Sequence, residues 1–201
     1  MGSVLPQKSS EISRSKMIIL PIFITGNKHK AAYLGKLLGI SLEHKNITMD
    51  EIQSTDTKQI TEDKARRAYE IVQQPVLVED VGLYFEAWGD LPGPFIKFFV
   101  EQENGLEKLC RMLDGFASRR AKTVVTTTYY DGSNFVHFDG GASGEIADAP
   151  RGTGGFGYDP IWCVDGYGGR TRAELTEAED HETYIAARPI EKMREFLAAD
   201  D

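Results

Sequence analysis

The chain has 201 residues, of which 41% are hydrophobic and 27% charged, and its formal net charge is −8. This composition is typical of a globular protein of one ordinary-sized domain. The excess of acidic residues excludes a basic footprint for duplex nucleic acid. An acidic protein that binds a polyanion therefore needs local lysine or arginine side chains and a divalent cation at its site.

The ends and the cysteines of the chain predict its compartment. Residues 1–16 are polar and lack the apolar core of a signal peptide, so we expect a disordered tail before a single domain over 17–201. The longest apolar stretch, 17–24, is too short to span a bilayer, so no membrane partner is expected. Cys110 and Cys163 match no metal spacing, which favours idle thiols in the reducing cytoplasm.

The first part of the chain alternates predicted strands and helices. An apolar run over 17–24 predicts a buried strand, and an amphipathic helix follows over 28–38 and stops at Gly39. The remaining expectations here are a short strand over 47–49, a helix over 61–72 with Thr61 as its N-cap, and a strand over 76–78.

The second part predicts a hairpin and a divided C-terminal helix. A rigid loop is expected over 91–94, helices over 95–101 and 105–113, strands over 122–130, 134–138, 142–146 and 160–164, and a helix over 176–199. Asp131-Gly132-Ser133 is a hairpin signal, and Pro189 kinks or splits the last helix. This order of elements predicts an α/β fold with a central mixed sheet.

Two pairs of acids follow predicted strands. Glu79-Asp80 closes the run over 76–78, and Asp50-Glu51 closes the one over 47–49. Carboxylates at the ends of strands can converge on one cation, and hard oxygen ligands suit Mg²⁺. Lys64 lies on the intervening predicted helix. The alternatives are a solvated junction between strand and loop and a surface lysine.

Two glycine-containing segments have the chemistry of nucleotide binding. In 25–30, Gly26 allows a sharp turn, and Lys30 adds charge beside the N-terminus of the next helix. In 152–160, the glycines let the backbone close on a flat ligand, with Phe156 and Tyr158 available for stacking. The alternatives are a structural turn and a flexible hairpin with core aromatics.

These segments, in this order, resemble the inosine triphosphate pyrophosphatase family over residues 18–197. The matching segments are Thr25-Gly26-Asn27-x-x-Lys30, Glu79-Asp80-Val81-Gly82-Leu83, the run from Gly89 to Phe99, and Pro150 through Pro160. The resemblance implies an α/β fold with a central mixed twisted sheet, flanking helices and a cleft between two lobes. It also implies a homodimer that cleaves a nucleoside triphosphate to the monophosphate and pyrophosphate with Mg²⁺, or Mn²⁺ in its place.

The resemblance also implies roles for individual residues. The metal ligands would be Glu51 and Asp80, and Asp80 or Glu79 would activate the attacking water. The substrate-binding residues would be Thr25, Gly26, Asn27, Lys28, His29, Lys30, Lys64, Val81, Phe156, Gly157, Tyr158 and Asp159.

The C-terminal segment departs from the family pattern. Asp180 stands at a family lysine that grips the purine's six-position oxygen, and Tyr184-Ile185-Ala186 stands at a Ser-His-Arg triplet. Neither His181 nor Arg188 restores that pattern, and Arg172 replaces an aromatic residue. We therefore expect weakened or altered selection for hypoxanthine and xanthine. Two alternatives remain open: a pyrophosphatase with a different base, and a nucleotide-binding pseudoenzyme.

Overall fold

The computed structural model describes residues 20–26 and 28–198 and, of Lys28 and His29, the backbone alone. The predicted tail, the start of the 17–24 strand, Asn27 and the side chains of Lys28 and His29 therefore lie outside the described residues. Within the described ranges, no helix is long and apolar enough to cross a membrane.

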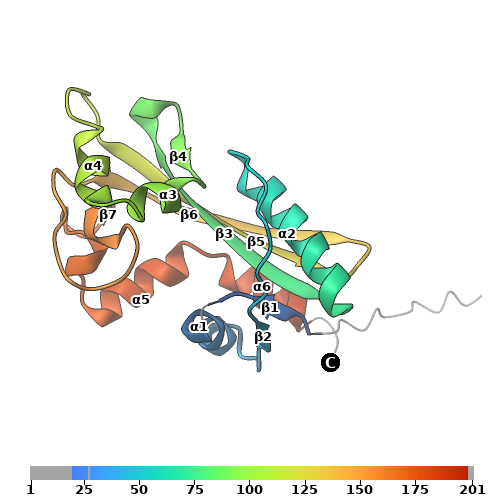
Figure 1. The fold of residues 1–201 in the computed structure, drawn as a ribbon. Coiled ribbons are helices and arrows are strands. Elements are labelled where there is room, and N and C mark those ends of the chain that lie inside the picture. Colours follow the sequence, from blue (N-terminus) through green and yellow to red (C-terminus); the bar gives the residue numbers. More distant parts are fainter. Residues whose placement is uncertain (1–19, 27, 199–201) are drawn as a thin grey trace, which may run out of the picture.

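Helices and strands alternate along the first half of the chain, and a long hairpin dominates the second half (Figure 1). The helices are α1 (Lys28–Leu38), α2 (Thr57–Val72), α3 (Ile96–Val100), α4 (Gly105–Arg111), α5 (Glu177–Ala186) and α6 (Ile190–Leu197). The strands are β1 (Ile22–Ile24), β2 (His44–Lys45), β3 (Val76–Phe85), β4 (Leu91–Gly93), β5 (Arg120–Tyr130), β6 (Phe135–Ile146) and β7 (Trp162–Val164). Short 3-10 turns are η1 (Glu86–Trp88), η2 (Asp159–Ile161) and η3 (Arg172–Glu174).

The strands form one mixed sheet in the order β2-β1-β3-β5-β6-β7, with β4 paired to β3. β2, β1 and β3 are parallel, whereas the pairs from β3 to β7 are antiparallel. The predicted α/β class, with a mixed sheet flanked by helices, is confirmed. Helix 28–38 with its end at Gly39, the hairpin at Asp131-Gly132-Ser133 and the break at Pro189 are also confirmed.

Two expectations for the chain before β3 are wrong. Residues 47–49 form no strand, because the strand that pairs with β1 is His44–Lys45, and Ile47 and Met49 pack from a loop against the core. Helix α2 begins at Thr57, not Thr61, because the Asp56 side chain caps it by accepting from the backbone N–H of Lys58 at 2.8 Å. Thr61 is instead buried and accepts a hydrogen bond from Thr128.

The strand expected over 76–78 does not end at the acidic pair. β3 continues to Phe85, and Glu79 and Asp80 pair with Thr127 and Thr126 of β5 in mid-sheet. Gly82 does not break the strand; a Cβ there would lie 2.5 Å from the Tyr84 ring, so glycine makes room for that ring. Polar residues inside a strand gave a false signal of its end. Likewise, 134–138 and 142–146 are one continuous strand, β6.

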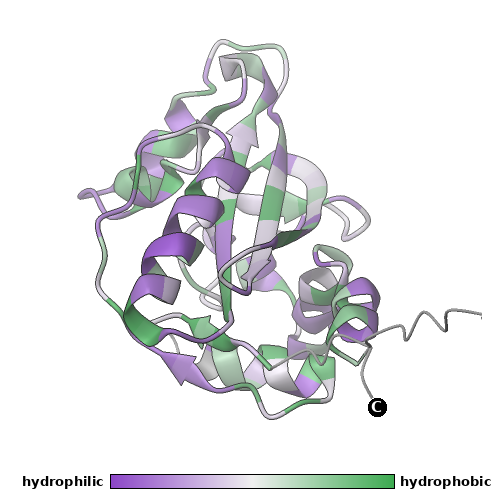
Figure 2. Ribbon diagram, turned by 90° about the vertical axis from the view of Figure 1, so that its right-hand side faces the viewer, coloured by the Kyte–Doolittle hydropathy of each residue, from purple (hydrophilic) through white to green (hydrophobic). Residues whose placement is uncertain are grey.

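β3 connects three hydrophobic clusters that form two lobes. Its first residues alternate between faces: Val76 and Val78 pack under α2, and Leu77 packs with α1 and α6. Farther along, Leu83 and Phe85 join a third cluster with α3, α4 and β7. In Figure 2, α2 faces the viewer, and most of its visible residues are hydrophilic, as expected of a helix covering one face of a sheet. Glu79 and Asp80 thus lie between the lobes.

Candidate functional site

One edge of β3 is open beside the acidic pair. β1 pairs with β3 only at Val76 and Leu77, and β4 pairs with it only from Leu83 onward. Among the described strands, none covers this edge between those points. Two cavities, of about 860 and 230 Å³, lie here and share Lys30 and Glu79 in their walls. The predicted cleft between the lobes is therefore present, beside the middle of β3 and not at its end.

The lining of the smaller cavity includes two lysines and one glutamate. Thr25, Gly26 and Lys30 line it at the end of β1 and the start of α1, and Lys64 reaches it from α2. The structure thus brings together four of the residues that the resemblance gives as substrate-binding. The N-terminus of α1 adds the positive end of the helix dipole. An anion is the ligand that this cavity suits.

Glu79 points to the face of the sheet that carries α1 and α6. Its carboxylate is 1% exposed and pairs with Lys30 and with Arg188, whose Nε donates at 2.9 Å and Nη2 at 3.1 Å. Burial opposes ionisation, but the two cations outweigh it and lower the pKa of Glu79 to about 2. Glu79 is therefore a permanent anion with two cationic partners.

Asp80 points to the opposite face, toward α2. Burial, together with the charge of Glu51, raises its pKa to about 6, although Lys64 opposes the shift. Its Oδ2 atom is buried and has no hydrogen-bond partner within the described part of the chain. Glu51 is held by Lys64, whose Nζ lies 3.2 Å from Glu51 Oε2. The two adjacent acids thus have opposite environments.

A divalent cation fits the Asp80 side of the site. The described residues contain no group of three or more His, Cys, Asp or Glu side chains placed to hold a metal. Mg²⁺ does not need one, because it commonly binds through one or two carboxylates, waters and substrate phosphates. The unpartnered oxygen of Asp80, with Glu51 nearby, provides such a donor pair, and a cation there would offset both charges.

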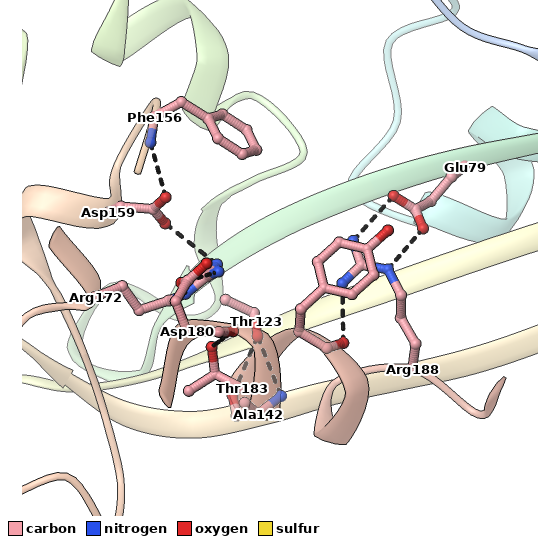
Figure 3. A network of polar contacts seen from close by, with 10 residues as sticks. Glu79, Thr123, Ala142, Phe156, Asp159, Arg172, Asp180, Thr183 and Arg188 are labelled. Carbon is pink, nitrogen blue, oxygen red and sulfur yellow. Dashed lines mark hydrogen bonds and ion pairs between the residues drawn. The ribbon is translucent and has the colours of Figure 1, made fainter. Parts of the chain in front are cut away.

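The larger cavity extends from the acids to the glycine-rich segment. Phe156, Gly157, Tyr158 and Asp159 line it at one end, and Asp80 and Val81 at the other. Figure 3 shows the Phe156 ring and the Asp159 carboxylate on one side of the site, with Glu79 and Arg188 on the other. The Phe156 side chain is exposed and free to stack on a flat ligand.

The glycine-rich segment is a tethered loop and not a flexible hairpin. Arg151 N–H donates to the Pro160 carbonyl at 2.8 Å, and Gly154 N–H to the Ala173 carbonyl at 3.0 Å. Gly155 has φ +70°, and a Cβ there would lie 2.3 Å from Asp159 Oδ2. The glycine therefore lets the loop close over Asp159, which accepts from Phe156 N–H at 2.9 Å.

The residues that depart from the family pattern mostly line this same cavity. Asp180 binds Arg172, and His181 hydrogen-bonds Tyr33 of α1. The Tyr184 ring lies 3.6 Å from the Arg188 guanidinium, and its hydroxyl is buried without a partner among the residues described. Ile185 packs against the α1–α6 cluster, and Ala186 is exposed, so neither resembles a base-binding side chain.

Three residues of the site were not assigned a role from the sequence. Arg188 pairs with Glu79, Arg172 pairs with Asp159, and Tyr33 packs edge-to-face on Tyr184 with ring centroids 4.8 Å apart. Arg188 and Glu79 are 109 positions apart in the chain. No local pattern marks such a pair, although the polar faces of α1 and α5 could have suggested Tyr33 and its neighbours.

Comparisons with known proteins show the family to which the chain is similar. The sequence model of the Ham1 family matches residues 21–196. The inosine triphosphate pyrophosphatase of Phaeosphaeria nodorum is 40% identical over 180 residues, which cover 88% of this chain and 93% of that protein. Inosine triphosphate pyrophosphatase 1 of Trypanosoma cruzi is 38% identical over 170 residues, covering 83% and 86%.

Solved structures share the fold. A HAM1 protein from Coxiella burnetii superposes with a TM-score of 0.74 at 27% identity, covering 88% of this chain and 97% of that one. A nucleoside-triphosphatase, or dITP/XTP pyrophosphatase, from Mycobacterium abscessus gives 0.72 at 25% identity, covering 86% and 97%. Together with the family match, these similarities confirm the resemblance drawn from the sequence, and the chain belongs to the Ham1 family, that of the inosine triphosphate pyrophosphatases.

Proposed function

We propose that this chain hydrolyses non-standard purine nucleoside triphosphates, such as ITP, dITP and XTP, to the monophosphate and pyrophosphate, and so cleans the nucleotide pool. The observation that carries the proposal is the buried, unpartnered oxygen of Asp80, a residue that lines the cavity with the aromatic side chains; that cavity shares Lys30 and Glu79 with the smaller one. The smaller cavity suits phosphates and the larger suits a base. The names of the relatives support the same activity.

The phosphates would be held by Thr25, Lys30, Lys64 and the N-terminus of α1. In the substrate-free protein, Lys30 pairs with Glu79, and Lys64 with Glu51. A triphosphate would compete for both lysines. Arg188 would then remain on Glu79, so that the buried carboxylate keeps a cationic partner while Lys30 turns to the substrate.

Asp80 is the better candidate for activating the water. A general base works best when its pKa lies near the operating pH, and burial raises the pKa of Asp80 to about 6. Both oxygens of Glu79 are engaged by cations, and its pKa of about 2 makes it a poor base. Glu79 would instead hold Lys30 beside the phosphates' cavity until the substrate binds.

Glu51 and Asp80 would hold Mg²⁺, or Mn²⁺ in its place. When bound, the ion would neutralise phosphate charge and lower the pKa of a coordinated water. Phe156 and Tyr158 would enclose the base, with Gly157 and Asp159 beside them and Val81 in the wall nearer the phosphates. Asn27, Lys28 and His29 remain proposals from the resemblance alone.

We also propose a cytoplasmic homodimer. Both cysteines are buried free thiols, which suits a reducing compartment. Leu91 and Phe98 are 41% and 61% exposed on β4 and α3, and a second copy of the chain could bury them.

Pyrophosphate release tests the proposed function directly. ITP, XTP, dUTP, ATP and GTP are supplied with Mg²⁺, and Asp80→Asn should lower kcat/KM by about 10²–10⁴-fold because it removes the base and weakens the metal site. Asp139→Asn, an exposed acid on β6, is the matched control and should leave the rate unchanged. No pyrophosphate from any nucleotide would favour a nucleotide-binding pseudoenzyme instead.

A further inference from the structure

Arg172 occupies the base end of the larger cavity. It lies on η3 and lines the same walls as Phe156 and Tyr158. Figure 3 shows its guanidinium beside Asp159 and Asp180, on the side of the site opposite Glu79. Its side chain is 17% exposed, so it is partly withdrawn from solvent but still open to the cavity.

Two carboxylates hold this guanidinium from different elements. Arg172 Nη1 lies 3.2 Å from Asp159 Oδ1, and Nε donates to Asp180 Oδ1 at 2.9 Å, with Nη2 bound to the same oxygen. An arginine has five N–H donors, and three of them are used in these contacts. Two N–H groups therefore remain, for which the described residues provide no partner.

The backbone that carries Arg172 is fixed. A capping box closes η3, with the Thr171 and Glu174 side chains bonded to each other's backbone N–H groups. Thr171 Oγ1 also donates to the Arg151 carbonyl at 2.9 Å, and Ala173 accepts from the glycine-rich loop. Asp180 is likewise on a capped helix, α5. The guanidinium is thus preorganised, so little entropy is lost when it binds a ligand.

We infer that Arg172 is a specificity-determining residue that binds the exocyclic carbonyl oxygen of the base, with Asp159 and Asp180 as its positioning residues. A guanidinium has only donors, so it favours a carbonyl acceptor over an amino group. Asp180 Oδ2, which Arg172 does not engage, would accept the ring N–H next to that carbonyl. The inference rests on the proposed function and adds the residue that selects the base.

This inference differs from the sequence-based expectation of weakened selection. That expectation followed from Asp180, Tyr184, Ile185 and Ala186 at the family's lysine and Ser-His-Arg positions. The change from the family lysine to Asp180 removes a positive charge from the base edge. In the structure, however, Asp180 binds Arg172, which supplies a positive charge there. The donor would therefore come from a different element, η3 instead of α5.

The test compares binding of two nucleotides that differ at one edge. Isothermal titration with Ca²⁺ in place of Mg²⁺, to suppress turnover, gives Kd for ITP and for purine riboside triphosphate, which has hydrogen instead of the six-position oxygen. We expect the wild-type chain to prefer ITP by about 10- to 100-fold, the range of a charged hydrogen bond. In Arg172→Met the preference should fall to within about 3-fold, while Kd for purine riboside triphosphate stays unchanged.

Two further variants separate base selection from folding. Arg120→Met breaks a comparable Arg–Asp pair, with Arg120 on Asp165 at 2.8 Å, outside both cavities and should keep the preference. Arg172→Lys keeps the positive charge but not the planar guanidinium, so it should retain only part of the preference for ITP. This variant takes the place of Arg172→Met if the methionine variant does not fold. ATP should bind wild type at least about 10-fold more weakly than ITP, because it presents an amino group.

The outcomes distinguish this inference from the proposed function. Three results would overturn the role of Arg172. They are an ITP preference that survives in Arg172→Met, an equal loss of affinity for ITP and purine riboside triphosphate in that variant, and wild-type binding of ATP as tight as that of ITP. Pyrophosphate release from ITP with Mg²⁺ would still stand in those cases. Conversely, an ITP preference that depends on Arg172 without any pyrophosphate release would support the inference and reject the enzyme activity.

Discussion

At the scale of single residues, the acidic pair shows how alternation along a strand gives neighbours opposite properties. Lys30 and Arg188 lie beside Glu79 and outweigh its burial, which lowers its pKa to about 2. Asp80 is desolvated by burial and lies near the charge of Glu51, and both effects raise its pKa to about 6. Glu79 therefore stabilises the fold above its ordinary pKa of 4.5, and this contribution is lost as the pH falls toward 2. Ionisation of Asp80, in contrast, destabilises the folded state.

Removing the charge of Asp80 should stabilise the metal-free protein. Its folded-state pKa lies above the ordinary 3.8, so the folded state holds the proton more tightly and stability falls as the pH rises from about 4 through 6. At pH 7.5 without metal, Asp80→Asn should raise Tm by roughly 3–8 °C, from about 1–3 kcal/mol.

The same variant should lose its response to metal. A cation bound at Asp80 should stabilise the folded wild-type chain, and this gain should shrink as the pH falls below about 6, because Asp80 takes up a proton. In Asp80→Asn, added Mg²⁺ should shift Tm very little at any pH. Calorimetric scans from pH 5 to 8 measure both effects, and a metal-free Asp80→Asn protein that melts below wild type would contradict them.

At the scale of elements, the junction between α5 and α6 is tied to the centre of the sheet. α5 ends at Ala186 and Pro189 is the N-cap of α6, so Arg188 lies in the short junction between them, with its guanidinium on Glu79 of β3 and beside the Tyr184 ring. The side chains of the pair are 9% and 1% exposed. A pair this deeply buried is strongly coupled to the fold, since either partner alone would be an uncompensated charge.

Breaking this pair should be costly. Arg188→Met leaves Glu79 with Lys30 as its remaining cation and should lower the free energy of unfolding by about 3 kcal/mol. The matched control is Arg67→Met, which removes an exposed i,i+4 partner of Asp63 and should cost about 0.5 kcal/mol or less. Urea unfolding at pH 7.5 compares the two variants. Equal losses in the free energy of unfolding would show that the buried pair stabilises the fold no more than the exposed pair does.

The glycine-rich loop offers a second prediction at this scale. In Gly155→Ala, the new methyl group would collide with the Asp159 carboxylate, which Arg172 and Phe156 N–H hold in place. We expect KM for ITP to rise by about 10-fold, the effect of losing one or two hydrogen bonds. Gly168→Ala has a similar φ, +65°, but no heavy atom within 4 Å. It should leave KM unchanged, which separates the collision from backbone strain.

At the scale of the whole molecule, β3 is the element that joins the two lobes. Its first residues belong to the clusters around α1, α6 and α2, and its last belong to the cluster with α3 and α4. Between them, one edge of the strand is left uncovered, and the two cavities form there. The site therefore exists because neighbouring strands are too short to cover the full length of β3.

The exposed apolar residues on β4 and α3 lead to a prediction about assembly. If a second copy buries Phe98, then Phe98→Glu should convert a dimer to a monomer, because a charge cannot be buried there without a partner. Light scattering coupled to gel filtration measures the mass. Phe116→Glu, at a 48% exposed phenylalanine after α4, serves as the comparison. A wild-type chain that is monomeric at micromolar concentration would contradict the dimer.

The sequence by itself determined the elements whose signals are local. The helix 28–38 and its stop at Gly39, the hairpin turn over 131–133 and the break at Pro189 all follow from periodicity and from backbone preferences of nearby residues. It also pointed to the turn over 25–30 and to the acidic pair, residues of which line the two cavities, because the members of each segment lie close together in the chain. The strand predicted over 47–49 is wrong because its apolar side chains pack against the core from a loop, which a local apolar pattern does not distinguish from a strand.

Only the tertiary structure decided how these pieces act together. The length of β3 depends on pairing with β5, so polar residues in its middle could not be recognised as internal. The separation of Glu79 from Asp80 onto two faces follows from that length. Arg172 and Arg188 pair with acids that folding brings close, and Arg188 and Glu79 are 109 positions apart in the chain. Local preferences fix elements, whereas burial and long-range charge pairing, which no local pattern encodes, fix the site.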